Sequence, residues 1–441
     1  MIKISMISQR KSCIKKIRAN GNRSGYTVKI IICIFVLIFL FISNLAIYYI
    51  IGTRYNSNWD VEIAQSSEQA WEGSPIGLTP DGNPIIEYQS QFGILVAWRS
   101  RNHVWQHENI GCSTDPFMES SMVVDNTGII HLVYLSGGFH QLVYAKKDGG
   151  AWERQTSEDA NYRSTSLAVD KNCNPHIIYS KSRHLNYTHW DNGNWTTVTI
   201  DTPTTNESSK IVVDNSNFPH ILSPDVSKKE LKYFHWNGSN WSKEVLDCRS
   251  FLVSNPDLCI DSKGSPHIVF VDEPNTSLKY IEKTGYEWNI ETVDATGVKY
   301  QPAIAIDKND EVHIAYNDNG LKYAKKVHDT WSIETIDSSK KAGRCPSITT
   351  DKTGNVYIAY IDRNTYNLNY ATTNKSGAFR TYPIAVTDYT IFIAVSVLIV
   401  TISLVSSNRL LIWRQKKTKD EKGPPRKIPV SLRKWLEHAK I

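Results

Sequence analysis

The stretch Cys259–Phe270, CIDSKGSPHIVF, decides the fold, because similar stretches recur along the chain. In a typical copy, a short apolar run precedes an Asp, a polar turn follows, and a His begins a second apolar run. This pattern is typical of two β-strands joined by a tight turn. The anchor position is occupied, at intervals of 44 to 47 residues, by Thr79, Asp125, Asp170, Asp214, Asp261, Asp307 and Asp351.

Each repeat continues with two more short strands. An apolar stretch such as LKYI (278–281) comes first, and a polar turn then leads to an aromatic residue and an alternating stretch such as WSIETID (331–337). The aromatic residues are Trp105, Trp152, Trp195, Trp241, Trp288, Trp331 and Phe379. Four strands per unit at this period indicate propeller blades. The sequence therefore predicts an all-β fold, a seven-bladed β-propeller of four-stranded blades.

The ring needs a strand to close it. The stretch WDVEIAQSS (59–67) is similar to WSIETIDSS (331–339), the last strand of a repeat, but no repeat precedes it. We expect it to complete the last blade and so clasp the two ends of the propeller. The stretch FRTYPIAV (379–386) competes for the same position.

Two apolar segments flank the repeats. Residues 30–53 and 389–408 carry no charge, and each is long enough to cross a bilayer, which takes about 20 helical residues. The first is longer than the apolar core of a typical cleaved signal peptide. We therefore expect a signal anchor and a second transmembrane helix on either side of the propeller.

The charge is divided between the tails and the body. Residues 1–29 hold eight Lys/Arg and no acid, and residues 409–441 hold eleven Lys/Arg and three acids, which leaves 31 basic and 41 acidic residues for the rest. Basic flanks stay in the cytoplasm. We expect two cytoplasmic tails in the cell membrane and an extracellular segment, 54–388. The acidic body does not favour a nucleic-acid partner.

The sequons fit an extracellular body. Seven Asn-x-Ser/Thr sites lie in 54–388 and predict glycosylation: Asn186, Asn194, Asn206, Asn237, Asn240, Asn275 and Asn374. Five cysteines in the same segment leave at least one outside any disulfide within the chain, and no C-x-x-C pair suggests a zinc site.

A column of histidines follows the Asp turns, and it admits two interpretations. The column reads Ile85, His131, His176, His220, His267, His313 and Tyr357. Equivalent positions in neighbouring blades are about 10 Å apart, too far to share one ion. We therefore expect structural histidines, hydrogen-bonded within each blade, with no metal and no cofactor. The Asp residues should cap the turns, and the aromatic residues should pack blade against blade.

A more variable column stands seven residues before each anchor, beside the inner strand of each blade. It reads Glu72, Met118, Arg163, Glu207, Ser254, Tyr300 and Arg344. Packing alone would not produce such variety in a regular scaffold. The candidate ligand-binding residues at the rim of the channel are Glu72, Arg163, Glu207, Tyr300 and Arg344; the alternative is that they are solvated loop residues.

The turns before the aromatic residues, as in KKDGGAW (146–152) and HWDNGNW (189–195), resemble a degenerate Asp-box of the sialidase-like, BNR-repeat propellers. The resemblance covers about 60–385 and implies the propeller fold. Sialidase catalysis would need an arginine triad, a Tyr–Glu pair and an acid/base Asp. No arginine motif of that family precedes Trp71, and GRCP (343–346) aligns with ordinary strand starts. The resemblance therefore implies no recognisable catalytic site.

These observations predict a membrane-anchored, cell-surface binding or interaction module for an extracellular protein or glycan, and not an enzyme. Two alternatives stay open. One is a sialidase-like, glycoside-processing enzyme, which would need paired carboxylates at the channel mouth. The other is a structural subunit of a membrane complex.

Overall fold

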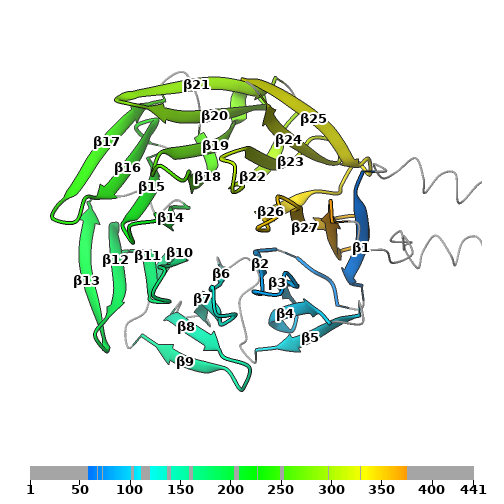
Figure 1. Cartoon of the computed structure of the whole chain (residues 1–441), viewed down its shortest axis with the longest axis horizontal. Helices are drawn as coiled ribbons and strands as arrows, with labels where there is room; N and C mark the ends of the chain where they lie inside the picture. The colour runs from blue at the N-terminus through cyan, green and yellow to red at the C-terminus, as the bar shows by residue number, and fades with distance from the viewer. Residues whose placement is uncertain are drawn as a thin grey trace, which may run out of the picture. The chain divides into compact units, whose positions relative to one another are not determined.

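The computed structural model describes residues 58–66, 68–71, 73–100, 104–110, 120–136, 141–157, 162–202, 208–225, 227–248, 253–295, 297–327 and 329–374. They belong to one compact unit, Ile51–Pro383. Within this unit seven antiparallel sheets of four strands each surround a central axis (Figure 1). The predicted seven-bladed propeller of four-stranded blades is confirmed.

Blades 1 to 3 each use four consecutive strands. Blade 1 contains β2 (Ile76–Leu78), β3 (Pro84–Ser90), β4 (Gly93–Arg99) and β5 (Trp105–Asn109); blade 2 contains β6 (Ser120–Val124), β7 (Ile130–Ser136), β8 (Gln141–Lys147) and β9 (Glu153–Thr156); blade 3 contains β10 (Tyr162–Val169), β11 (Pro175–Lys181), β12 (His184–Asp191) and β13 (Asn194–Asp201).

Blades 4 to 6 follow the same plan. Blade 4 contains β14 (Lys210–Val213), β15 (Pro219–Asp225), β16 (Glu230–Trp236) and β17 (Trp241–Asp247); blade 5 contains β18 (Val253–Ile260), β19 (Pro266–Asp272), β20 (Ser277–Thr284) and β21 (Glu287–Asp294), with the 3-10 helix η1 (Glu273–Asn275) between β19 and β20; blade 6 contains β22 (Lys299–Ile306), β23 (Val312–Asn317), β24 (Leu321–Val327) and β25 (Thr330–Asp337).

Blade 7 joins the two ends of the unit. Its inner strands are β26 (Arg344–Thr350), β27 (Val356–Asp362) and β28 (Asn367–Thr372), and its outermost strand is β1 (Asp60–Gln65). β1 runs antiparallel to β28, with Val61 opposite Ala371. The prediction that 59–67 closes the ring is confirmed. The competing stretch, 379–386, lies outside the described residues.

The innermost strands form a closed circle. Each contacts the next, from β2 through β6, β10, β14, β18 and β22 to β26, and β26 contacts β2 (Figure 1). Stacking of this kind buries both faces of every sheet, which no single blade can do alone. The second strands show the consequence: β15, β19 and β27 are buried along their whole length.

Tryptophan packing joins neighbouring blades, as expected. Trp195, Trp241, Trp288 and Trp331 each place the indole edge-on against a Tyr of the preceding blade, with ring centroids 5.2 to 5.3 Å apart. At the closure, Trp59 beside β1 packs on Tyr323 of blade 6 at 5.0 Å. The N-terminal strand therefore brings its own interblade tryptophan.

The membrane predictions fall outside the part of the chain that the structure describes. Within the described ranges, no helix combines the length and the apolar character needed to cross a bilayer. The expected spans, 30–53 and 389–408, and the tails, 1–29 and 409–441, are not among those ranges.

The clasp predicts a large effect of one substitution. Trp59 is fully buried, and its indole N–H donates to Glu334 Oε1 at 2.8 Å. Trp59→Ala should lower the free energy of unfolding by about 3–5 kcal/mol, as measured by chemical denaturation. Trp59→Phe keeps a ring against Tyr323 and should lose less. Equal, small losses in both variants would contradict a clasp at this position.

Candidate functional site

The anchor Asp residues hold the turns after the inner strands. In blade 4, Asp214 Oδ1 accepts the backbone N–H groups of Ser216 and Phe218, both at 2.8 Å. Asp261 accepts those of Lys263 and Ser265 in the same way, at 2.9 and 2.7 Å. The predicted capping role is confirmed, and the second carboxylate oxygen is left to face the His column.

Each column histidine connects its Asp to a tyrosine on the third strand. In His131, His176 and His313, Nδ1 hydrogen-bonds with a Tyr hydroxyl at 2.6 to 2.7 Å, and His220 and His267 make the same bond. Their Nε2 atoms lie 3.1 to 3.8 Å from the anchor carboxylates. The predicted hydrogen bonds of the histidines within each blade are confirmed.

The tyrosine partners were not anticipated from the sequence, although a Leu-x-Tyr motif carries each of them. They are Tyr144, Tyr187, Tyr233, Tyr280 and Tyr323. Four of these rings, and Tyr323 at the closure, also receive the tryptophan of the next blade. One side-chain series, Asp–His–Tyr–Trp, thus fixes a turn, a blade and a blade interface together.

A polar cavity of about 360 Å³ lies along the central channel, and all seven blades contribute to its lining. Hydroxyl groups dominate the lining, with contributions from Ser74, Ser120, Ser121, Thr165, Ser166, Ser208, Ser209 and Ser347. Gln89, Gln301, Lys210 and Asp257 add amide and charged groups.

Several lining side chains also tie adjacent inner strands together. Ser121 Oγ accepts the backbone N–H of Leu167 at 3.2 Å, and Ser347 Oγ accepts that of Ile76 at 3.2 Å. Asp257 takes the same role in blade 5, where its carboxylate accepts the N–H of Ile304 at 3.0 Å. A serine hydroxyl that accepts one hydrogen bond still has a hydrogen to donate to a ligand.

The inner strands begin with a backbone irregularity in four blades. The register between the first and second strands shifts at the start of β10, β18, β22 and β26. In each case a residue without glycine's freedom takes a positive φ: Ser164, Asn255, Tyr300 and Cys345. Bulges re-aim side chains and are common beside functional sites. These starts coincide with the variable column that the sequence singled out.

The structure brings two of the five candidate rim residues together. Tyr300 is 50% exposed, and the guanidinium carbon of Arg344 lies 5.2 Å from the centre of its ring. The next residues along the chain, Gln301 and Cys345, line the cavity. Arg163 lies in β10, opposite Ser180. Glu72 and Glu207 are not among the described residues.

A buried carboxyl beside the channel escaped the sequence analysis. Glu87 of β3 is fully buried; its Oε2 accepts the Ser120 hydroxyl at 2.9 Å, and its Oε1 has no hydrogen-bond partner within the described ranges. Desolvation raises its pKa to about 8, although the bond from Ser120 lowers it in part. The only signal in the sequence is that Glu87 follows the apolar residues Pro84, Ile85 and Ile86 in the strand PIIEYQS.

The predicted glycosylation sites differ in access. Asn194, Asn237, Asn240 and Asn275 are exposed, and Asn374 is partly exposed. Asn186 is 9% exposed, and its amide nitrogen donates to the His184 carbonyl at 3.2 Å. Asn206 lies in an undescribed stretch. Glycosylation at these positions stays a prediction.

Comparison with known proteins shows the fold alone. No family model and no curated protein matches the chain. A streptogramin B lyase is 13% identical over 71% of this chain and 97% of its own, with a TM-score of 0.50. An ulvan lyase, a polysaccharide lyase solved bound to -[GlcA(1-4)Rha3S]-, is 12% identical over 70% and 94%, with a TM-score of 0.51. A Hadza microbial sialidase is 11% identical over 69% and 65%, with a TM-score of 0.40.

The buried histidines predict a loss of stability in acid. Burial lowers the pKa of both His176 and His220 to about 4. Below the unfolded-state pKa of histidine, about 6.5, these imidazoles take up protons in the unfolded chain but stay neutral in the folded chain. The free energy of unfolding therefore falls as the pH drops toward 4. Each such histidine contributes about 1.4 kcal/mol per pH unit. Denaturation at pH 7, 6 and 5 measures this slope, and a flat profile would contradict it.

Glu87 predicts the opposite trend at higher pH. Because its folded-state pKa is raised, the unfolded chain ionises first, and stability falls as the pH rises from 4.5 toward 8. At pH 8, the free energy of unfolding of Glu87→Gln, measured by chemical denaturation, should therefore exceed that of the wild type by up to a few kcal/mol. This difference should shrink toward pH 5. The exposed Glu287→Gln is the control. A pH-independent difference would show that Glu87 is ionised without penalty.

Proposed function

We propose that this chain is a membrane-anchored, cell-surface propeller that binds a protein or glycan at the mouth of its central channel and carries out no chemistry on it. The single observation that carries the proposal is the contact between Tyr300 and Arg344, whose chain neighbours Gln301 and Cys345 line a hydroxyl-rich cavity. Most aromatic residues of the blades are occupied in packing between blades, whereas Tyr300 is half exposed.

The chemistry of the rim suits recognition. An exposed aromatic ring offers a flat face for a sugar or an aliphatic side chain, and an adjacent guanidinium can pair with a carboxylate. Hydroxyl and amide groups below it supply directional hydrogen bonds. The bulged backbone fixes Tyr300 at a positive φ of 64°, and a ligand site on a rigid element loses little entropy on binding.

Binding without chemistry is favoured over hydrolysis. Glycosidases commonly place two carboxyl groups about 5–9.5 Å apart. Among the described residues that line the cavity, Asp257 is the one carboxylate. Asp257 already holds the backbone of the neighbouring blade. The alternative of a glycoside-processing enzyme would therefore have to recruit groups such as Glu87 from behind the lining.

The rim predicts a loss of binding in two variants. Full-length chain in detergent, applied to a broad glycan array and used for cross-linking capture from its own cells, should retain a saturable ligand. Tyr300→Ala and Arg344→Ala should each weaken that binding by about tenfold or more.

Tyr286→Ala is the matched control, because Tyr286 is 98% exposed in the turn between β20 and β21. Melting temperatures verify that all three variants fold. If the rim variants bind the ligand as tightly as the wild type, the channel mouth is excluded as the binding site. Turnover of a bound glycan would favour the enzyme instead.

A further inference from the structure

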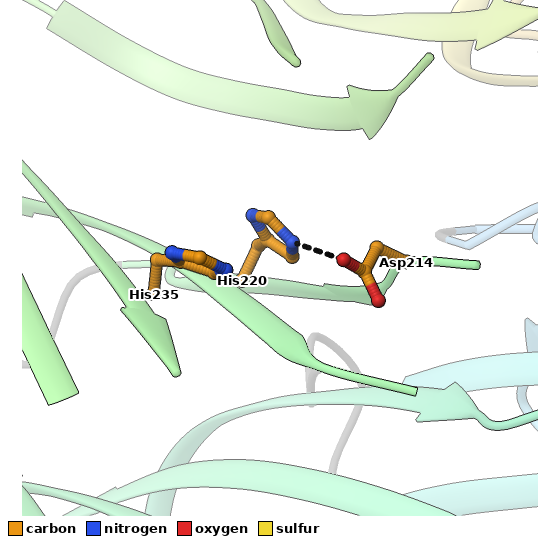
Figure 2. Close-up of side chains that lie close together, drawn as sticks. All are labelled: Asp214, His220 and His235. Atoms are coloured by element: carbon orange, nitrogen blue, oxygen red, sulfur yellow. Dashed lines mark ion pairs between the residues drawn. The ribbon is translucent and has the colours of Figure 1, made fainter. Parts of the chain in front are cut away.

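A second cavity, of about 310 Å³, lies between blades 4 and 5, away from the starts of the inner strands. Its lining includes His220, Tyr233, His235 and Glu244 of blade 4, together with the β18–β19 turn at Lys263–Pro266. Figure 2 shows His220 between Asp214 and His235, and the two histidines line this cavity.

Three potential metal ligands meet there. Asp214, His220 and His235 each offer one donor atom, and these three atoms all lie within 4.8 Å of one another. His235 stands directly opposite His220 in the β15–β16 ladder, and the two rings stack with centroids 4.3 Å apart. The set of two imidazoles and one carboxylate suits a divalent transition ion, above all Zn²⁺.

The spacing of the donors fits an ion between them. His220 Nε2 lies 3.5 Å from Asp214 Oδ2, too far for a good hydrogen bond, and makes none although the side chain is only 2% exposed (Figure 2). Two ligands on a tetrahedral zinc ion, each about 2.0–2.1 Å from it, stand about 3.3–3.4 Å apart.

The surrounding groups orient two of the ligands, His220 and Asp214. The Tyr233 hydroxyl hydrogen-bonds with His220 Nδ1, which orients the ring and leaves Nε2 to face Asp214. Asp214 Oδ1 is held by two backbone amides, so Oδ2 remains available.

Nearby cations are partly neutralised. Lys283 Nζ lies 2.5 Å from Glu244 Oε1, and Trp288 also donates to this Glu at 2.9 Å. Lys263 belongs to the exposed turn of blade 5. The lining therefore presents two lysines and one carboxylate, Glu244. Asp214 itself is not paired with a lysine among the described contacts.

Corresponding positions in other blades lack this arrangement. The residue opposite the column histidine is Lys146 in blade 2, Glu282 in blade 5 and Lys325 in blade 6. In blade 6, a comparable group, Asp307, Glu311 and His313, already has a cation, because Lys325 Nζ lies 2.6 Å from Glu311. Blade 3 has His189 opposite His176, but those rings are 5.8 Å apart.

We propose that Asp214, His220 and His235 bind one divalent transition metal ion at the interface of blades 4 and 5, with a fourth coordination position open to the cavity. Equivalent histidines of different blades stand too far apart to share one ion. This site uses two histidines of one blade, brought together by the pairing of β15 with β16.

Equilibrium dialysis of the metal-stripped, full-length chain against Zn²⁺ tests the proposal, with bound metal counted by mass spectrometry. His235→Ala is the informative variant, since His235 lies outside the Asp–His–Tyr series. His189→Ala is its matched control in blade 3. We expect the wild type and His189→Ala to bind one equivalent of Zn²⁺ tightly. His235→Ala should bind Zn²⁺ at least tenfold more weakly, since even mutation of residues that only hydrogen-bond to metal ligands lowers metal affinity by about 10–100-fold.

Zinc should also raise the melting temperature of the wild type and of His189→Ala, but not of His235→Ala. If the alanine variant melts early without metal, His235→Gln, which preserves the bulk, replaces it. Tight binding retained in His235→Ala, binding lost equally in both variants, or no tight equivalent in the wild type would each overturn the proposal.

Discussion

The side-chain series of Asp, His and Tyr, covered by the tryptophan of the next blade, is the set of contacts on which the propeller depends. Asp caps the turn after the inner strand, His connects the first two strands to the third, and Tyr receives the neighbouring indole. Blade 7 shortens the series, because Tyr357 donates directly to Asp351 at 2.8 Å. In the five blades that carry a column histidine, this series lies at one end of the inner strand, and the variable column that includes the rim residues lies at the other end.

The sequence revealed those parts of the fold that repeat. Anchors spaced by 44 to 47 residues counted the blades, and the similarity of 59–67 to 331–339 identified the closing strand. It did not reveal the tyrosine partners, because the direction of a side chain depends on how strands pair. It placed Tyr300 and Arg344 in one column but could not foresee the bulges that bring them into contact. Glu87 was missed because burial, and not position in the repeat, gives it its unusual pKa.

The two candidate sites occupy opposite ends of the inner strands. The rim of Tyr300 and Arg344 lies where β22 and β26 begin, whereas Asp214 follows the end of β14. The channel is made by all seven blades and so requires the closed ring. The histidine pair of blade 4 needs only its own sheet and the turn of blade 5. A ligand at the rim and an ion between the blades can therefore be present independently.

Because the channel exists only if the ring closes, the most direct measurement is a cross-link across the clasp. Val61 and Ala371 are paired in the β1–β28 ladder, where Cα atoms stand about 4.5–5.5 Å apart, within the range of a disulfide. V61C/A371C should form this disulfide under mild oxidation, seen by peptide mass spectrometry, and its melting temperature should rise. Thiols that stay unlinked at these two positions in the folded chain would show that β1 does not pair with β28, so that another strand would have to close blade 7.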